Sequence, residues 1–210
     1  MQNGWRFNGQ TRGHRIRDDV DHRLQMLERS ENLLNSSKVI RRETVATTTL
    51  EEAWKAWTTV EGVTSFFVPK ANIESVVGGR YELFLSLKAP KGFQGTEGCK
   101  VLAVEPLKHL AFEFIAPPQF PNVRRLTTRV DVIFDQVAKG GVVKLDLVHS
   151  GFLEGEEWDE FFEFSTWNWD LVLGRFQYRF SGGPIDWNNP YIPHGISARP
   201  ERKLRDHISS

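Results

Sequence analysis

The sequence has a single cysteine, Cys99, so no disulfide can form within the chain, which fits a reducing compartment. Its 27 basic and 27 acidic residues balance, so no net charge attracts nucleic acid or an anionic membrane. No apolar run reaches the length of a membrane span. The polar, basic N-terminus lacks the apolar stretch of a secretory signal. We therefore expect a cytoplasmic protein that has no membrane span and binds no nucleic acid.

Motifs for metals and phosphates are also missing. The six histidines are scattered, with no pair at helical or strand spacing and no second cysteine, so we expect no metal site and no cofactor. Gly78-Gly79 and Gly140-Gly141 lack the strand–loop–helix context of a phosphate loop and predict turns. The acidic residues of 154–160 precede or begin a helix, where carboxylates are favourable. They therefore predict a stabilised helix start, with a cation or partner site as the alternative.

The chain is rich in aromatic residues, with 15 Phe and 7 Trp. Its apolar residues recur with two spacings, one typical of a helix and one typical of strands. Across 156–180 apolar residues recur at steps of three and four, which predicts one long helix with an aromatic face. Earlier runs predict strands over 38–46, 72–77, 80–87, 96–105, 109–115, 126–135 and 142–150. Those over 80–87, 109–115, 126–135 and 142–150 alternate in the manner of half-buried strands. Thr49, with Glu52 three residues later, predicts the start of a short helix over 50–58, and 61–67 predicts a second helical turn.

These elements predict an α+β fold. A curved antiparallel sheet of about seven strands wraps around one long C-terminal helix, with two short helices after the first strand. We expect residues 1–37 to be an N-terminal extension, either disordered or partly helical. Residues 38–183 then form the domain, and 184–210 form a C-terminal tail.

Several local strings, in this order and spacing, resemble the START-like (SRPBCC, helix-grip) superfamily. Within it they are similar to the branch named for the C-terminal domain of the activator of the heat-shock-90 ATPase. The strings are LEEAWKAWTTVEGVTSFF (50–67), VGGRYEL (77–83), GCKVLAVEPLKHLAFEF (98–114), LVHSGF (147–152) and EEWDEFFEFSTWNWDLVLGRF (156–176). The branch shares no catalytic triad or metal motif, so the resemblance implies no catalytic residues.

The resemblance implies that a small hydrophobic or aromatic molecule binds in an internal cavity without catalysis. We expect the ligand-binding lining to come from the apolar side of each strand and the inner stripe of the long helix. It comprises Tyr81, Leu83, Leu85, Phe112, Phe114, Thr128, Val130, Val132, Leu145, Leu147, His149, Trp158, Phe162, Ser165 and Trp169. Solid packing between sheet and helix would remove this interpretation.

Two other functions remain open. The first is a protein-interaction module whose partner is a chaperone or another protein and which needs no cavity. The second is a cyclase or hydrolase on the same scaffold, with His149 acting beside a carboxylate such as Glu97.

The polar candidates each have a structural alternative. His149 either orients a ligand or is held by structural hydrogen bonds, and the same choice applies to Thr128. Ser165 either donates to a ligand or bonds back to the carbonyl four residues earlier. We expect Cys99 to be a buried small hydrophobe. We expect Arg124 and Arg125 to be solvated, with contact to a ligand headgroup as the alternative.

Overall fold

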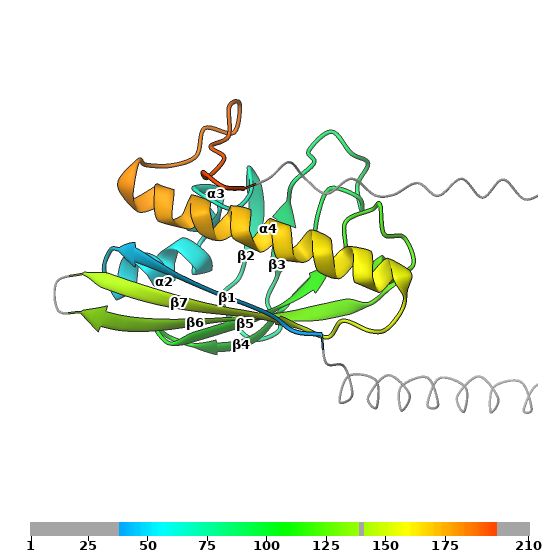
Figure 1. Ribbon diagram of the computed structural model, residues 1–210, viewed down its shortest axis with the longest axis horizontal. Helices are drawn as coiled ribbons and strands as arrows, with labels where there is room; N and C mark the ends of the chain where they lie inside the picture. Colours follow the sequence, from blue (N-terminus) through cyan, green and yellow to red (C-terminus); the bar gives the residue numbers. More distant parts are fainter. Residues whose placement is uncertain (1–37, 139–140, 197–210) are drawn as a thin grey trace, which may run out of the picture. The chain divides into compact units, whose positions relative to one another are not determined.

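A five-stranded antiparallel sheet underlies one long helix (Figure 1). This is a computed structural model that describes residues 38–138 and 141–196, so our predictions for 1–37 and 197–210 lie outside the described residues. The strands are β1 (Ile40–Thr47), β2 (Lys70–Ile73), β3 (Tyr81–Phe84), β4 (Val101–Glu105), β5 (His109–Ile115), β6 (Thr127–Ala138) and β7 (Val142–Ser150). The helices are α2 (Leu50–Thr58), α3 (Val60–Thr64), the 3-10 helix η1 (Val123–Arg125) and α4 (Glu156–Ser181). The predicted α+β helix-grip architecture is confirmed.

The seven strands form two sheets. The order β1-β7-β6-β5-β4 makes the larger sheet, in which β4 to β7 follow one another as a meander and β1 pairs with β7. β2 and β3 form a separate antiparallel pair, and an isolated bridge between Arg80 and Lys100 connects the start of β3 to the start of β4. The first strand therefore lies beside the last, a non-sequential pairing that a simple meander does not contain.

Alternation along the strands sets which face is buried. In β7, Val143, Leu145, Leu147 and His149 are buried while the residues between them are partly exposed. β3 is shorter than the predicted strand over 80–87. It ends at Phe84, and the two leucines that continue the alternation, Leu85 and Leu87, are about half exposed. The chain leaves the sheet there and enters a long loop over 85–97.

The short helices begin where the sequence predicts. Thr49 Oγ1 accepts a hydrogen bond from the backbone N–H of Glu52 at 3.2 Å, which satisfies one of the free amides at the start of α2. Thr59 does the same for α3 through the N–H of Gly62 at 3.0 Å. These caps place the buried ring of Trp57 against Phe66 and Phe67, which follow α3.

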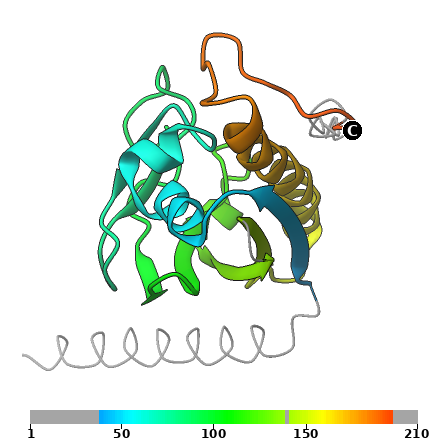
Figure 2. The same cartoon turned by 90° about the vertical axis from the view of Figure 1, so that its left-hand side faces the viewer.

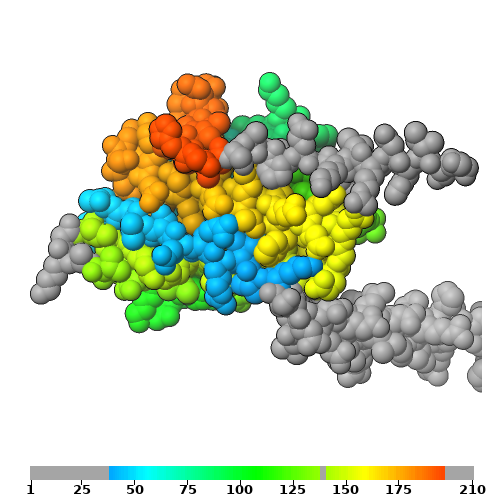
Figure 3. All heavy atoms as spheres, in the orientation of Figure 1, coloured from blue at the N-terminus to red at the C-terminus, as the bar shows by residue number. Residues whose placement is uncertain are grey.

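α4 lies over the sheet, and Figure 2 shows the sheet curving below it, with α2 and α3 to the left of α4 over the same face of the sheet. Its buried residues are Trp158, Phe161, Ser165, Asn168, Trp169, Val172, Leu173 and Phe176. β1 and α4 lie side by side at the surface (Figure 3), where Arg42 Nε donates to Asp170 Oδ1 at 2.5 Å. Within the part of the chain that the structure describes, no helix combines the length and the apolar character needed to cross a membrane.

Residues 184–196, in the segment predicted as a tail, fold back onto the helices. Tyr191 stacks on Tyr178 of α4 with ring centroids 4.0 Å apart, and Trp187 Nε1 donates to the carbonyl of Thr64 at 2.7 Å. Ile185 is buried in the core. The packed part of the domain therefore extends past residue 183.

Candidate ligand-binding site

A cavity of about 640 Å³ opens between the first half of α4 and two long loops, one over 85–97 and one over 116–125. Its lining residues are Phe67, Leu85, Ser86, Ala89, Pro90, Phe93, Gln94, Gly95, Thr96, Phe114, Ile115, Pro117, Pro118, Gln119, Phe164 and Asn168. This volume is within the range of small-molecule sites. From the large sheet only Phe114 and Ile115 of β5 border this cavity, so it lies beside the loops, whereas buried side chains fill the gap between the rest of the sheet and α4.

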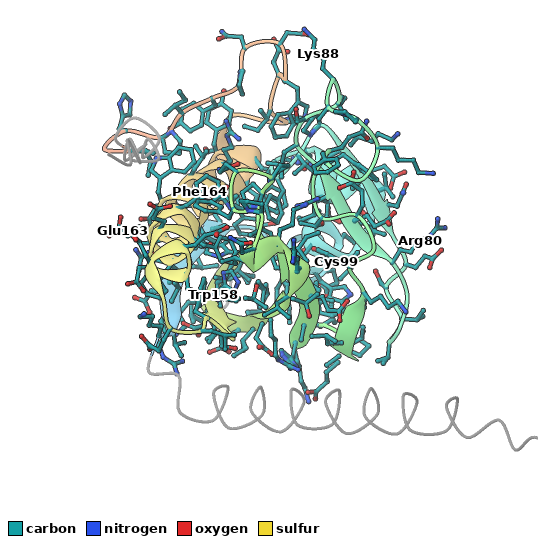
Figure 4. All side chains as sticks on the ribbon, turned by 90° about the vertical axis from the view of Figure 1, so that its right-hand side faces the viewer. Arg80, Lys88, Cys99, Trp158, Glu163 and Phe164 are labelled. Atoms are coloured by element: carbon teal, nitrogen blue, oxygen red, sulfur yellow. The ribbon has the colours of Figure 1, made fainter. Side chains whose placement is uncertain are left out.

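Aromatic rings from three elements form the inner wall. Phe67 follows α3, Phe114 lies on β5 and Phe164 lies on α4. The buried ring of Trp169 lies behind them, with centroids 5.6 Å from both Phe67 and Phe114. In Figure 4, Glu163 is on the outer side of α4, whereas Phe164 faces the interior. Since these rings come from packed elements, the wall is fixed before a ligand arrives.

The outer wall consists of the two loops, which are held together by the Glu97–Arg124 pair. Arg124 Nη2 donates to the carbonyls of Gly92 (2.7 Å) and Gly95 (2.9 Å), and its Nη1 donates to the carbonyl of Ala116. Its distance to Glu97 Oε2 is 3.4 Å. The side chain is only 11% exposed, so our expectation that Arg124 is solvated is wrong. Its planar guanidinium can bond several carbonyls at once, which explains the burial.

Glu97 holds the loop over 85–97 through hydrogen bonds to its backbone. Its carboxylate accepts hydrogen bonds from the backbone N–H groups of Gly92, Gln94 and Gly95 at 2.8–2.9 Å. Burial by itself raises the pKa of Glu97, but these amide hydrogen bonds outweigh it and hold the pKa below its usual value. The carboxylate is thus committed to shaping the loop.

Replacing Arg124 with alanine is expected to loosen the loop over 85–97. Three carbonyls would lose a charged donor, so we expect the free energy of unfolding to fall by about 1–3 kcal/mol. Hydrogen exchange of the amides of residues 92–97 should accelerate. Arg125→Ala is the matched control, because Arg125 is exposed and should leave both quantities nearly unchanged. Equal exchange rates in the two variants would contradict this role.

His149 is fully buried at the centre of a short polar network. Trp169 Nε1–H donates to His149 Nδ1 at 3.0 Å, so the neutral ring carries its proton on Nε2. Nε2 then donates to Thr128 Oγ1 at 2.7 Å, and the Thr128 hydroxyl donates to the carbonyl of Phe114 at 2.9 Å. Each polar atom in this chain has a partner.

This network holds His149 neutral. Burial lowers the pKa of His149 to about 3, and the rings of Phe114, Phe152 and Phe161 pack around it. Neither His149 nor Glu97 lines the cavity, and the hydrogen bonds of both are made to other groups. The structure therefore does not bring His149 and Glu97, the pair expected of a cyclase or hydrolase, together in the cavity.

Two of the fifteen residues predicted to line a site, Leu85 and Phe114, lie on the cavity wall. Phe162 is half-buried and packs on Phe152 with centroids 5.0 Å apart. The other predicted residues are buried in the surrounding packing: Tyr81, Leu83, Phe112, Thr128, Val130, Val132, Leu145, Leu147, His149, Trp158, Ser165 and Trp169. Ser165 is buried and its hydroxyl has no partner among the described residues, so the bond back to the helix carbonyl does not form.

The sequence analysis missed Asn168. This residue lies on the buried face of α4 and lines the cavity, and it is 7% exposed. Its carboxamide has no hydrogen-bond partner within the described ranges 38–138 and 141–196. The signal was available, because Asn168 is three residues after Ser165 and therefore on the same helix face. Residues of the two loops, such as Phe93 and Pro117, were missed because alternation and helical period say nothing about loops.

Other candidate groups have structural roles. Burial raises the pKa of Cys99 to about 12, so the thiol is held protonated. At the start of α4, Glu157 accepts hydrogen bonds from the backbone and side chain of Asn122, and Lys38 bridges Glu154 and Asp159. Among residues 38–138 and 141–196, no group of three or more acidic, histidine or cysteine side chains could hold a metal ion.

Comparison with known proteins agrees with this architecture. The model of the family described as Activator of Hsp90 ATPase homolog 1-like protein matches residues 47–179. Comparison with curated protein sequences gives no match.

Among solved structures, protein MLL2253 from Mesorhizobium loti is 19% identical, with a TM-score of 0.55 over 70% of this chain and 99% of that chain. The Aha1 dimer from Colwellia psychrerythraea is 17% identical, with a TM-score of 0.52 over 69% of this chain and 97% of that chain. Protein SSP2350 from Staphylococcus saprophyticus is 11% identical, with a TM-score of 0.53 over 71% and 96%. At these identities the likeness shows the shared fold alone.

Proposed function

The chain belongs to the family of Activator of Hsp90 ATPase homolog 1-like proteins, and from this premise we propose that it binds a small hydrophobic or aromatic molecule without catalysis. The observation that carries the proposal is the cavity of about 640 Å³ with its aromatic inner wall. Each Å² of apolar ligand surface removed from water there contributes roughly 25 cal/mol.

The cavity distinguishes this proposal from its two alternatives. A protein-interaction module would need an exposed surface but no internal space. An enzyme would need reactive groups facing the bound molecule, whereas His149 and Glu97 are engaged elsewhere. Binding is the function for which the cavity wall is suited as it stands.

Filling part of the cavity should weaken binding. Ala89 lines the cavity from the loop over 85–97, and Ala89→Trp would place an indole at its mouth. With the uncharged fluorescent probe N-phenyl-1-naphthylamine, we expect the dissociation constant to rise by about 10-fold or more, because the indole takes the space of the probe. The measurement is a fluorescence titration of the full chain.

Val76→Trp is the matched control, since Val76 is 63% exposed and does not line the cavity. It adds the same side chain at a distant surface and should leave the titration unchanged. If native protein does not take up the probe, or if both variants bind equally, the proposal is wrong. Native mass spectrometry of the purified protein would then identify any co-purified ligand.

A further inference from the structure

We propose that the cavity selects uncharged aromatic molecules carrying a hydroxyl or carbonyl group, and that the Asn168 carboxamide recognises this group. The inference rests on the proposed ligand-binding function. It adds the chemical class of the ligand and one specificity-determining residue.

The charge of the wall supports the first part. None of the residues that line the cavity is Asp, Glu, Lys, Arg or His. A charged ligand entering this space would lose its hydration without gaining an opposite charge, which is strongly unfavourable. Glu97 and Arg124, which connect the two loops of the outer wall, are bound to backbone groups and to each other. Lys88 lies at the outer tip of the loop in Figure 4 and does not line the cavity.

Asn168 supports the second part. Its carboxamide offers two N–H donors and one acceptor oxygen, and it has no hydrogen-bond partner among the described residues. The residue as a whole is 7% exposed. The carboxamide atoms are not among the fully buried side-chain atoms that lack a partner, so water that enters the cavity can reach them in the unliganded protein. Because Asn168 faces the cavity, a ligand hydroxyl or carbonyl can supply the missing partner.

The other buried polar side chain on this wall is already satisfied. Thr96 Oγ1 accepts from the N–H of Leu83 at 2.9 Å and donates to the carbonyl of Tyr81. On the loop, Gln94 Nε2 donates to the carbonyl of Ala89 at 2.9 Å. Asn168 is therefore the group through which the inner wall can distinguish a polar from an apolar ligand. The rings of Phe67, Phe114 and Phe164 around it favour a planar ligand.

Three probes with one ring system test this inference: naphthalene, 2-naphthol and 2-naphthoate, titrated at pH 7 into the full chain. We expect 2-naphthol to bind about 10-fold more tightly than naphthalene, because only its hydroxyl can pair with Asn168. The anionic 2-naphthoate should bind at least about 10-fold more weakly than 2-naphthol. In Asn168→Leu, which keeps the shape of the side chain, the ratio of the naphthol and naphthalene dissociation constants should fall to about 1.

A second readout is independent of any ligand. Asn168→Leu should leave the melting temperature of the unliganded protein nearly unchanged, because the amide forms no hydrogen bond to another described residue and faces the cavity. If this variant fails to fold, Asn168→Ala tests the same loss of preference. The proposal is overturned if 2-naphthoate binds as tightly as 2-naphthol, or if the folded variant keeps the native preference.

Failure of the proposed function has a different signature. If native protein binds none of the three probes, or if Ala89→Trp does not weaken naphthalene binding, ligand binding in the cavity is wrong and this inference falls with it. If naphthalene binds and Ala89→Trp blocks it, but no preference for 2-naphthol exists, only the role of Asn168 is wrong.

Discussion

His149→Ala is expected to lower the free energy of unfolding by about 3–5 kcal/mol, a large share of the 5–15 kcal/mol typical of a domain. The substitution removes the acceptor of Trp169 Nε1–H and the donor to Thr128 Oγ1, both of which are buried. It also opens a cavity among Phe114, Phe152 and the neighbouring rings. Urea unfolding followed by tryptophan fluorescence measures the loss.

The matched control is His109→Ala. His109 is a partly exposed histidine on β5 whose Nε2 lies 2.8 Å from Asp131 Oδ1. Because this pair is near the surface, its removal should cost less than about 1 kcal/mol. Comparable losses in the free energy of unfolding would mean that the buried network stabilises the protein no more than the surface pair does. In the double variant with Trp169→Phe, the cost should be less than the sum of the single costs, because both substitutions break the same hydrogen bond.

The second large effect is the pH dependence of stability. Burial lowers the folded-state pKa of His149 to about 3, whereas in the unfolded chain a histidine titrates near 6.5. Below about pH 6.5 the unfolded chain therefore binds one more proton than the folded protein. The contribution of His149 is complete above this pH and is lost as the pH falls toward 3. Between pH 7 and 5 we expect a loss of about 2 kcal/mol from this residue.

His149→Gln isolates this contribution, since glutamine is polar but does not titrate. Its free energy of unfolding should change less between pH 7 and 5 than that of the native protein, by about the same 2 kcal/mol. This range avoids the carboxylates, such as Glu97 and Asp131, whose pKa values are lowered by hydrogen bonds and which therefore titrate in more acidic solution. Parallel pH profiles for the two proteins would contradict a neutral, buried His149.

The local elements were predictable because each rests on a short-range rule. Alternation placed β5 and β7 at the observed residues, and the threonine before residue 50 placed the start of α2. The helical period found α4 to within one residue at its end. The same period chose Phe162 for the inner stripe, although Phe161 is the fully buried residue. On a helix these two neighbours are separated by about 100°, so the sheet decides which is covered.

The cavity wall was much less predictable. Alternation along a strand identifies the buried face, but it does not say which buried residues contact one another and which border a cavity. Leu147 and Phe114 have the same pattern in the sequence, yet Leu147 is core and Phe114 faces the cavity. The loop over 85–97 carries no periodic signal, and its position depends on Arg124, which is distant in the chain.

By itself, the sequence determined the elements, their order and the faces they bury, because hydrogen bonding within a helix and alternation along a strand act over a few residues. Only the tertiary structure decided that Arg124 is buried, that His149 is neutral and that Asn168 faces a cavity without a partner. Each of these depends on which distant groups surround a side chain. Burial and hydrogen-bond partners are properties of the packed chain, and no local pattern specifies them.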